Sequence, residues 1–390
     1  MPVDFWRQAG YYFFLYAVLG LVSPYLGYWL SNTMGEGMKY AMATFYATMI
    51  FVPALWGHAA FTPREGQLRP GQWLTFASLG AAVFSLGLTQ VSPDLPVLTA
   101  CFLVLAFGLF FNALVALVES ISYTLIDSPA AFSRIRVFGS IGFLVCSVAL
   151  GGTIVFSYPW TFPYLLAAIM TVAWLQSTHY KRIALPCPPP SPDQTLKSLP
   201  RSALRLWALW GVVAMTQAAF ACYFTFFALR LRDLGFSGIL IGALIGAAAA
   251  AEIFMFLRLG PLVARYSARA LIIFSTLITV VRWIVLSLVT SPAWWPVVAL
   301  AQMSQAFGFS VFHVSCMRVL RENSPTVHFG ALRGISEAVG YGLGAAAGVL
   351  MAGTLWESGR PAGVFLLAAS LAFASCLFAC FLPKNKEHSR

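Results

Sequence analysis

Several ionisable side chains stand inside long apolar stretches of this sequence, where a charge has no water around it. They are Glu119, Asp127, Arg136, Glu252, Arg258, Arg282, His313 and Glu337. Such a group costs several kcal/mol inside a membrane and is retained where it lines a solute or ion pathway. Each is therefore a candidate for solute binding, proton transfer or a structural ion pair.

Glu119 in FFNALVALVESISYTLI and Arg136 in RIRVFGSIGF belong to consecutive apolar runs. Runs joined by a short loop are antiparallel neighbours, so the two charges are expected to face each other as a substrate-binding pair. The alternative places both at the membrane surface, with Arg136 as a positive anchor. Asn112 in the same run as Glu119 is a further polar contact or a packing residue.

Glu252 follows an alanine run in GAAAAAEIFMF, and Arg282 lies in LITVVRWIVL. Small residues allow close helix approach, and a desolvated carboxylate favours its neutral form, as a proton-coupling site requires. Arginine stays charged and needs a counter-ion or an anionic substrate. The alternatives are a structural hydrogen bond for Glu252 and a permanent ion pair for Arg282, with Glu252 as the nearest partner.

Three further groups have weaker signals. His313 is a second proton-coupling candidate or a hydrogen-bonding residue. Glu337, four residues after Arg333, suits a gate or a structural pair on one helix face. Gln217 and Tyr223 in MTQAAFACYFTFFAL are candidate substrate contacts, although aromatic stripes at helical spacing usually pack.

Composition shows which elements must position these residues. The 390 residues are 59% hydrophobic and only 9% charged, against about 25% charged in a soluble domain. Mean hydropathy is +0.79. Lipid must solvate much of the chain, and apolar runs of helical length predict an all-α membrane protein with twelve transmembrane helices. The predicted spans are 9–31, 39–61, 71–91, 96–126, 135–156, 161–179, 204–229, 237–259, 269–290, 294–317, 331–354 and 361–382.

The spans group as six, a break and six. The break, IALPCPPPSPDQTLKSLP, is Pro-rich and predicts a semi-rigid tether. We expect an N-terminal six-helix bundle over 1–182, a cytoplasmic linker over 183–203 and a C-terminal six-helix bundle over 204–390. At an offset of 197 residues the halves align as a parallel repeat, which pairs Phe132 with Phe329, Arg136 with Arg333 and Gly151 with Gly348.

The net charge of +11 lies mostly in loops. Eighteen Lys and Arg fall on the side of the amino terminus and four on the other, which predicts both termini in the cytoplasm. No basic stripe with interleaved aromatic residues indicates nucleic-acid binding. No Walker sequence, H-E-x-x-H or nucleophile elbow indicates an enzyme, and the seven cysteines have no metal-binding spacing. We expect no cofactor and an ion gradient, a proton gradient rather than sodium, as the energy source.

Several stretches resemble the major facilitator superfamily over most of the chain. RIRVFGSIGFLVCS, TVVRW and VSCMRVL resemble helices five, nine and ten of the lactose permease (oligosaccharide–proton symporter) family. AAAEIFMF, SARALIIFSTLITVVRW and FHVSCMRVL resemble the 3-phenylpropionate permease group even more closely. This resemblance implies the major facilitator fold.

The resemblance also implies roles for single residues. Glu119 and Arg136 fall where the symporter binds sugar, Phe143 replaces its stacking tryptophan, and Arg282 matches an arginine near its proton site. Gln305 and Gly308 stand where that symporter has a histidine and a glutamate. Coupling is therefore expected to run through Glu252 and His313.

Together these patterns predict a proton-coupled importer of an aromatic or other organic carboxylate. We expect it to rock around a midplane site in a bacterial inner membrane as a monomer. Its expected partners are the solute, protons and membrane lipid. The alternatives are a sugar, nucleoside or siderophore permease of the same fold, or a transport-dead membrane receptor or assembly partner.

Overall fold

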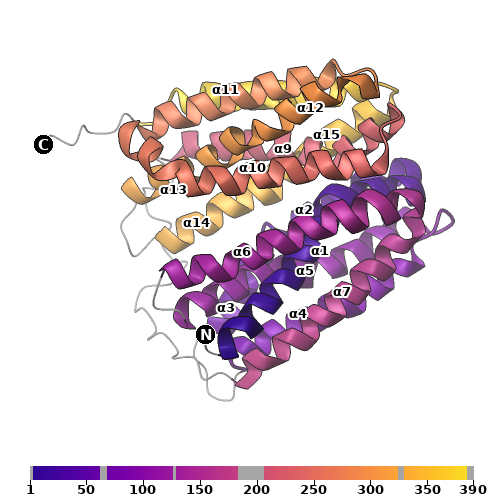
Figure 1. The fold of residues 1–390 in the computed structure, drawn as a ribbon, viewed down its shortest axis with the longest axis vertical. Helices are drawn as coiled ribbons and strands as arrows, with labels where there is room; N and C mark the ends of the chain where they lie inside the picture. The colour runs from indigo at the N-terminus through magenta and orange to yellow at the C-terminus, as the bar shows by residue number, and fades with distance from the viewer. Residues whose placement is uncertain (1–2, 62–67, 126–128, 183–205, 324–328, 384–390) are drawn as a thin grey trace, which may run out of the picture. The chain divides into compact units, whose positions relative to one another are not determined.

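The computed structural model describes residues 3–61, 68–125, 129–182, 206–323 and 329–383. Every regular element in these ranges is helical (Figure 1). The chain divides into two compact units, Met1–Leu196 and Lys197–Arg390. The predicted linker, 183–203, and Asp127 lie outside the described residues, as do the side chains of Phe132 and Phe329.

Unit 1 is an all-helical bundle. Its elements are α1 (Val3–Met34), α2 (Met38–Thr48), α3 (Val52–Phe61), α4 (Pro70–Gly87), α5 (Val97–Leu125), α6 (Pro129–Val145), a π-helical stretch (Cys146–Val155) and α7 (Phe162–Ser177). Proline at the first turn of α4 and α7 suits a helix start, because that position needs no backbone N–H.

Unit 2 has the same helical character. Its elements are α9 (Trp207–Asp233), α10 (Gly238–Arg265), α11 (Ala268–Ser287), α12 (Trp295–Met303), a π-helical turn (Ala306–Val311), α13 (Phe312–Glu322), α14 (Phe329–Glu337), a second π-helical turn (Ala338–Gly344), α15 (Ala345–Glu357) and α16 (Pro361–Ala379). Ser237 and Ser267 cap α10 and α11 by accepting hydrogen bonds from backbone N–H groups.

Ten segments of the described chain are long and apolar enough to cross a membrane. The first, Phe5–Phe61, has 57 residues. At 1.5 Å per residue it would extend about 85 Å, against a hydrocarbon core of about 30 Å, so it holds more than one crossing. The predicted span at 161–179 corresponds to α7, whose 16 residues are not among the ten.

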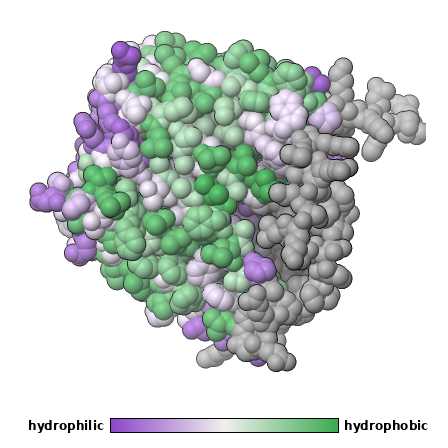
Figure 2. Space-filling view, turned by 180° about the vertical axis from the view of Figure 1, so that it is seen from behind, coloured by the Kyte–Doolittle hydropathy of each residue, from purple (hydrophilic) through white to green (hydrophobic). Residues whose placement is uncertain are grey.

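The surface agrees with a lipid environment. Figure 2 shows apolar side chains across much of the described face in view. Large apolar residues stand outward, among them Leu98 of α5, Leu300 of α12 and Phe381 just after α16, each more than 60% exposed. Patches of this extent are rare on soluble monomers. The chain is thus a multi-pass membrane protein.

Close glycine contacts hold the same pair of spans together in each unit. A Cβ on Gly142 of α6 would lie 2.1 Å from the Phe13 carbonyl oxygen of α1. In unit 2, a Cβ on Gly344 would lie 2.4 Å from the Ala214 carbonyl oxygen of α9. Each Gly-rich span therefore packs backbone to backbone on the first helix of its unit. This contact positions Arg136 in unit 1 and Glu337 in unit 2.

Candidate functional site

Arg282 lies on the inner face of α11. Ser275, Thr279, Arg282 and Leu286 recur at helical spacing and are all buried, so this stripe points into unit 2. The hydroxyls of Ser275 and Thr279 bond to backbone carbonyls of their own helix. Arg282 is therefore the charged member of a face that otherwise satisfies its own polar groups.

The Arg282 guanidinium is held between an amide and two aromatic rings. Its Nη2 donates to Oε1 of Gln302 at 2.7 Å, and Nε2 of Gln302 donates to the Tyr223 hydroxyl at 2.7 Å. The guanidinium carbon lies 4.4 Å from the ring centroid of Tyr223 and 4.4 Å from that of Trp283. The electron-rich ring faces attract the cation, by up to about 2 kcal/mol when it is desolvated.

The guanidinium of Arg282 makes fewer hydrogen bonds than its N–H groups allow. Arg282 is 2% exposed, and its Nε and Nη1 have no hydrogen-bond partner within the ranges that the structure describes. Among the described residues no carboxylate oxygen lies within ion-pair distance of it. Burying a charge without a partner is costly. The arrangement is thus suited to receive an anion.

Glu252 lies on α10 behind the alanine run, and no cation in the described part of the chain is within ion-pair distance of it. Nε2 of Gln305 donates a hydrogen bond to its Oε1. Gln302 is near the end of α12 and Gln305 directly precedes the π-helical turn Ala306–Val311, and each amide bonds to one of the two charges. Glu252 and Arg282 attract each other electrostatically.

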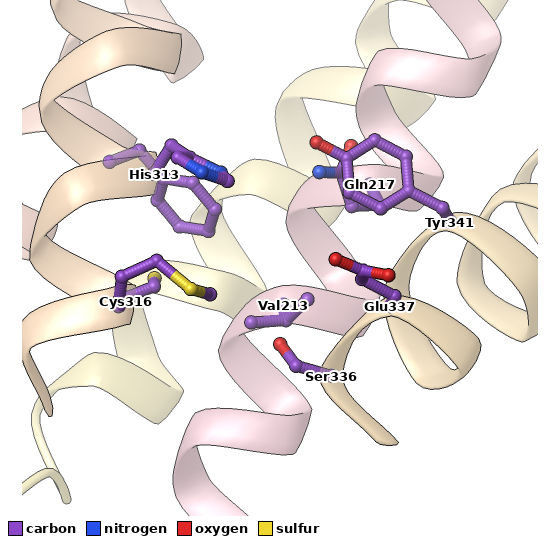
Figure 3. A pocket seen from close by; sticks show the side chains of 9 residues that line it. Val213, Gln217, His313, Cys316, Ser336, Glu337 and Tyr341 are labelled. Atoms are coloured by element: carbon purple, nitrogen blue, oxygen red, sulfur yellow. The ribbon is translucent and has the colours of Figure 1, made fainter. Parts of the chain in front are cut away.

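A pocket opens elsewhere in unit 2. It is lined by Val213, Gln217, Phe312, His313, Cys316, Met317, Ser336, Glu337 and Tyr341. Figure 3 shows His313 on one side, with Glu337 and Tyr341 facing it from the other. We call this the polar pocket. Gln217 lies here, apart from Tyr223, although both were predicted to contact substrate.

Two of its lining residues have further contacts. The His313 ring stacks on Phe309, with 6.1 Å between centroids and 20° between planes. Arg333 donates from Nε to Oε1 of Glu337 at 3.0 Å. The spacing of four residues between Arg333 and Glu337 thus produces an ion pair along one face of α14.

In unit 1 the structure joins Glu119 and Arg136. Nη1 of Arg136 donates to Oε1 of Glu119, and the Tyr16 hydroxyl donates to the same oxygen at 3.4 Å. The guanidinium lies 5.1 Å from the Tyr16 ring centroid. The Arg136 side chain is 42% exposed and that of Glu119 is 17% exposed. The pair is neutralised within the unit and partly open to solvent.

Asn112 and Phe143 have mainly packing contacts. Nδ2 of Asn112 donates to Oγ1 of Thr48 at 2.7 Å, which ties α5 to α2. Phe143 is half-buried on α6, and its backbone lies against Gly20 of α1, where a Cβ would be 2.4 Å from the Phe143 carbonyl oxygen. Arg258 is exposed, 5.2 Å from the Phe254 ring centroid.

Sequence reasoning missed Trp283, Gln302, Tyr16 and Tyr341. Trp283 directly follows Arg282, and Tyr341 follows Glu337 by four residues, so adjacency to the charges was an available signal. Gln302 had no such signal, because it is a neutral residue 20 positions away from Arg282. Tyr16 had none, because it comes from a helix far from Glu119 in the sequence.

A multi-pass helical membrane protein with charges gathered inside its bundles belongs to the class of membrane transporters. The comparisons with known proteins agree, since the MFS_1 like family model matches residues 5–367. The chain belongs to this family. It is 26% identical over 377 residues to the probable 3-phenylpropionic acid transporter of Escherichia coli (strain K12). The matched region covers 94% of this chain and 94% of that protein.

Solved structures share the fold. The nucleoside transporter NupG superposes with a TM-score of 0.81 at 17% identity, covering 99% of this chain and 100% of that one. An auto inhibited POT family peptide transporter has a TM-score of 0.77 at 14% identity, covering 100% and 99%. These relatives and neighbours are transporters rather than enzymes, and at these identities the two structures show the fold alone.

Proposed function

We propose that this chain is a proton-coupled symporter that imports an aromatic or other organic monocarboxylate across a bacterial inner membrane. The observation that carries the proposal is Arg282, a buried cation with two unpaired nitrogens between two aromatic rings. A carboxylate accepts hydrogen bonds from such donors. The ring faces of Tyr223 and Trp283 suit an aromatic or apolar substituent.

Charge balance in unit 2 links the anion to a proton. With Arg282 charged and Glu252 ionised, the empty site is neutral overall. An anion alone would leave one net negative charge in a low-dielectric interior, and a proton on Glu252 alone would leave one net positive charge. Only the empty site and the site with both ligands are neutral, so the two ligands favour each other's binding.

The partner of Glu252 suits this role. Gln305 is a neutral amide, so protonation of Glu252 breaks no direct ion pair. Oε1 of the same amide has no hydrogen-bond partner in the described part of the protein. That oxygen can accept a hydrogen bond once the carboxyl is protonated and the amide turns. Glu252 is thus held in a setting that tolerates both protonation states.

The transport cycle is alternating access in a twelve-span major facilitator protein with both termini in the cytoplasm. Arg282 is closed off in the described conformation, so substrate reaches it in another state of the cycle. Glu119 and Arg136, with Tyr16 beside them, are the proposed substrate contacts in unit 1. We expect the protein to act as a monomer with no cofactor.

Uptake into proteoliposomes tests the proposal. The probe is labelled 3-phenylpropionate, chosen because the curated relative is described as a probable transporter of that acid. A pH gradient, acid outside, should drive accumulation by the wild type. Glu252→Gln should abolish the response to the gradient. Glu322→Gln is the matched control, because Glu322 pairs with Arg318 on the exposed part of α13.

Two results would overturn the proposal. Uptake that ignores the imposed pH gradient, or that responds normally in Glu252→Gln, removes the proton coupling. If the wild type transports a nucleoside or a sugar but no organic carboxylate, the substrate is neutral and the proposed substrate class is wrong.

A further inference from the structure

The polar pocket of unit 2 gathers hydrogen-bonding and titratable side chains from three parts of the chain. Gln217 comes from α9, His313 from α13, and Glu337 and Tyr341 from α14 and the π-helical turn that follows it. Membrane helices seldom collect such groups without a use, because each is costly in a lipid environment. The groups also surround an open space rather than a packed contact (Figure 3).

Tyr341 lines the polar pocket together with Gln217 and Glu337. Glu337 and Glu252 both act electrostatically on its hydroxyl. A hydroxyl donates and accepts at once, so it can receive one proton while it releases another.

We infer that the polar pocket is the route by which the coupled proton passes between Glu252 and bulk water, with Tyr341 as the relay and Glu337 as the exchange group. This inference rests on the proposed coupling at Glu252. The neutral Glu252 carboxyl releases its proton through intervening water toward the oxygen of Tyr341, which lines the pocket. The Tyr341 hydroxyl proton passes to the Glu337 carboxylate, so tyrosine stays neutral and one proton has moved.

The surroundings of Glu337 suit exchange with water. Its side chain is 34% exposed, and Arg333, its ion-pair partner on the same helix, is 45% exposed. His313 and Cys316 face it from α13, and Gln217 faces it from α9. Protonation of Glu337 removes the charge that holds Arg333.

Two transport modes separate this role from binding and folding. Net uptake driven by a pH gradient requires the proton to be released in every cycle. Exchange of labelled for unlabelled 3-phenylpropionate at equal concentrations and equal pH requires only that the loaded protein reorient. The variants are Glu337→Gln and Tyr341→Phe, with Glu322→Gln as the control for loss of a carboxylate paired at the same helical spacing.

We expect Glu337→Gln and Tyr341→Phe to slow net uptake at least about tenfold, the low end of what a positioned proton-transfer group contributes at enzyme sites. Exchange should stay close to wild type in both, which shows that the variants fold and bind. Glu322→Gln should match wild type in both modes.

The outcomes distinguish this inference from the proposed function. Net uptake by Glu337→Gln equal to that of Glu322→Gln overturns the route, and so does equal loss of exchange and net uptake in both variants. If Glu252→Gln loses its response to the gradient while Glu337→Gln keeps it, the route alone is wrong. If Glu252→Gln responds normally, the coupling fails and the route fails with it.

Discussion

Substitution of Arg282 by glutamine tests the anion site most directly. Glutamine keeps a donor that can reach Gln302 but removes the charge and the two unpaired nitrogens of the guanidinium. A charge-assisted hydrogen bond contributes about 1.5–3 kcal/mol. Loss of at least one such bond to the carboxylate should raise the half-saturation concentration for 3-phenylpropionate about 10- to 150-fold.

Stability should respond differently from affinity. The substitution removes a buried charge that has no anionic partner among the described residues, and this offsets the lost hydrogen bond and ring contacts. We expect the melting temperature in detergent to stay close to that of the wild type. Substrate should raise the melting temperature of the wild type and have little effect on Arg282→Gln, because ligand binding stabilises the folded state.

Arg258→Gln is the matched control, since Arg258 is also within a membrane-length helix but is exposed beside Phe254. It should retain the wild-type half-saturation concentration. The reasoning is refuted if Arg282→Gln also retains it, or if Arg258→Gln loses affinity equally. A large fall in melting temperature for Arg282→Gln alone would show that the arginine is structural.

Two further predictions concern the framework around the sites. Glu119→Gln should lower the free energy of unfolding by less than about 1 kcal/mol, because its partner Arg136 is 42% exposed and exposed pairs contribute little. Uptake should nevertheless fall. A melting curve measured beside an uptake assay separates the two effects. Gly344→Ala should lower stability by about 1–3 kcal/mol, since the added Cβ would lie 2.4 Å from the Ala214 carbonyl oxygen. Gly334→Ala, whose Cβ meets nothing within 4 Å, should leave the melting temperature unchanged or slightly raised.

The membrane helices could be predicted from the sequence because a lipid bilayer requires apolar segments of a certain length, and such segments are visible in the sequence. The family could be predicted because several stretches resemble it. The number of crossings was harder to obtain. Phe5–Phe61 is one apolar segment of 57 residues, and α7 has only 16 helical residues, so neither fits the simple rule of one run per crossing. Where a segment bends or ends in a 3-10 turn, the number of apolar runs no longer equals the number of crossings.

The charged members of the candidate sites could also be predicted, because an ion in an apolar run is conspicuous. Their partners could not. Gln302 is a neutral residue whose importance comes only from its position between Arg282 and Tyr223. Span adjacency favoured Glu252 as the counter-ion of Arg282, whereas the structure gives Arg282 a hydrogen bond to Gln302 and Glu252 a hydrogen bond to Gln305. The sequence pattern does not show which side chains the packing of the helices brings into contact.

The two units differ in how their inner charges are paired. In unit 1, Arg136 and Glu119 meet directly, so neither needs another partner. In unit 2, Arg282 and Glu252 each bond to a neutral amide, so the cation keeps donors that have no partner among the described residues and the carboxylate keeps an uncharged neighbour. A direct ion pair there would compete with both an anion and a proton. Neutral partners leave each charge available to a mobile ligand while the empty site stays neutral, which is what coupled movement of an acid anion and a proton requires.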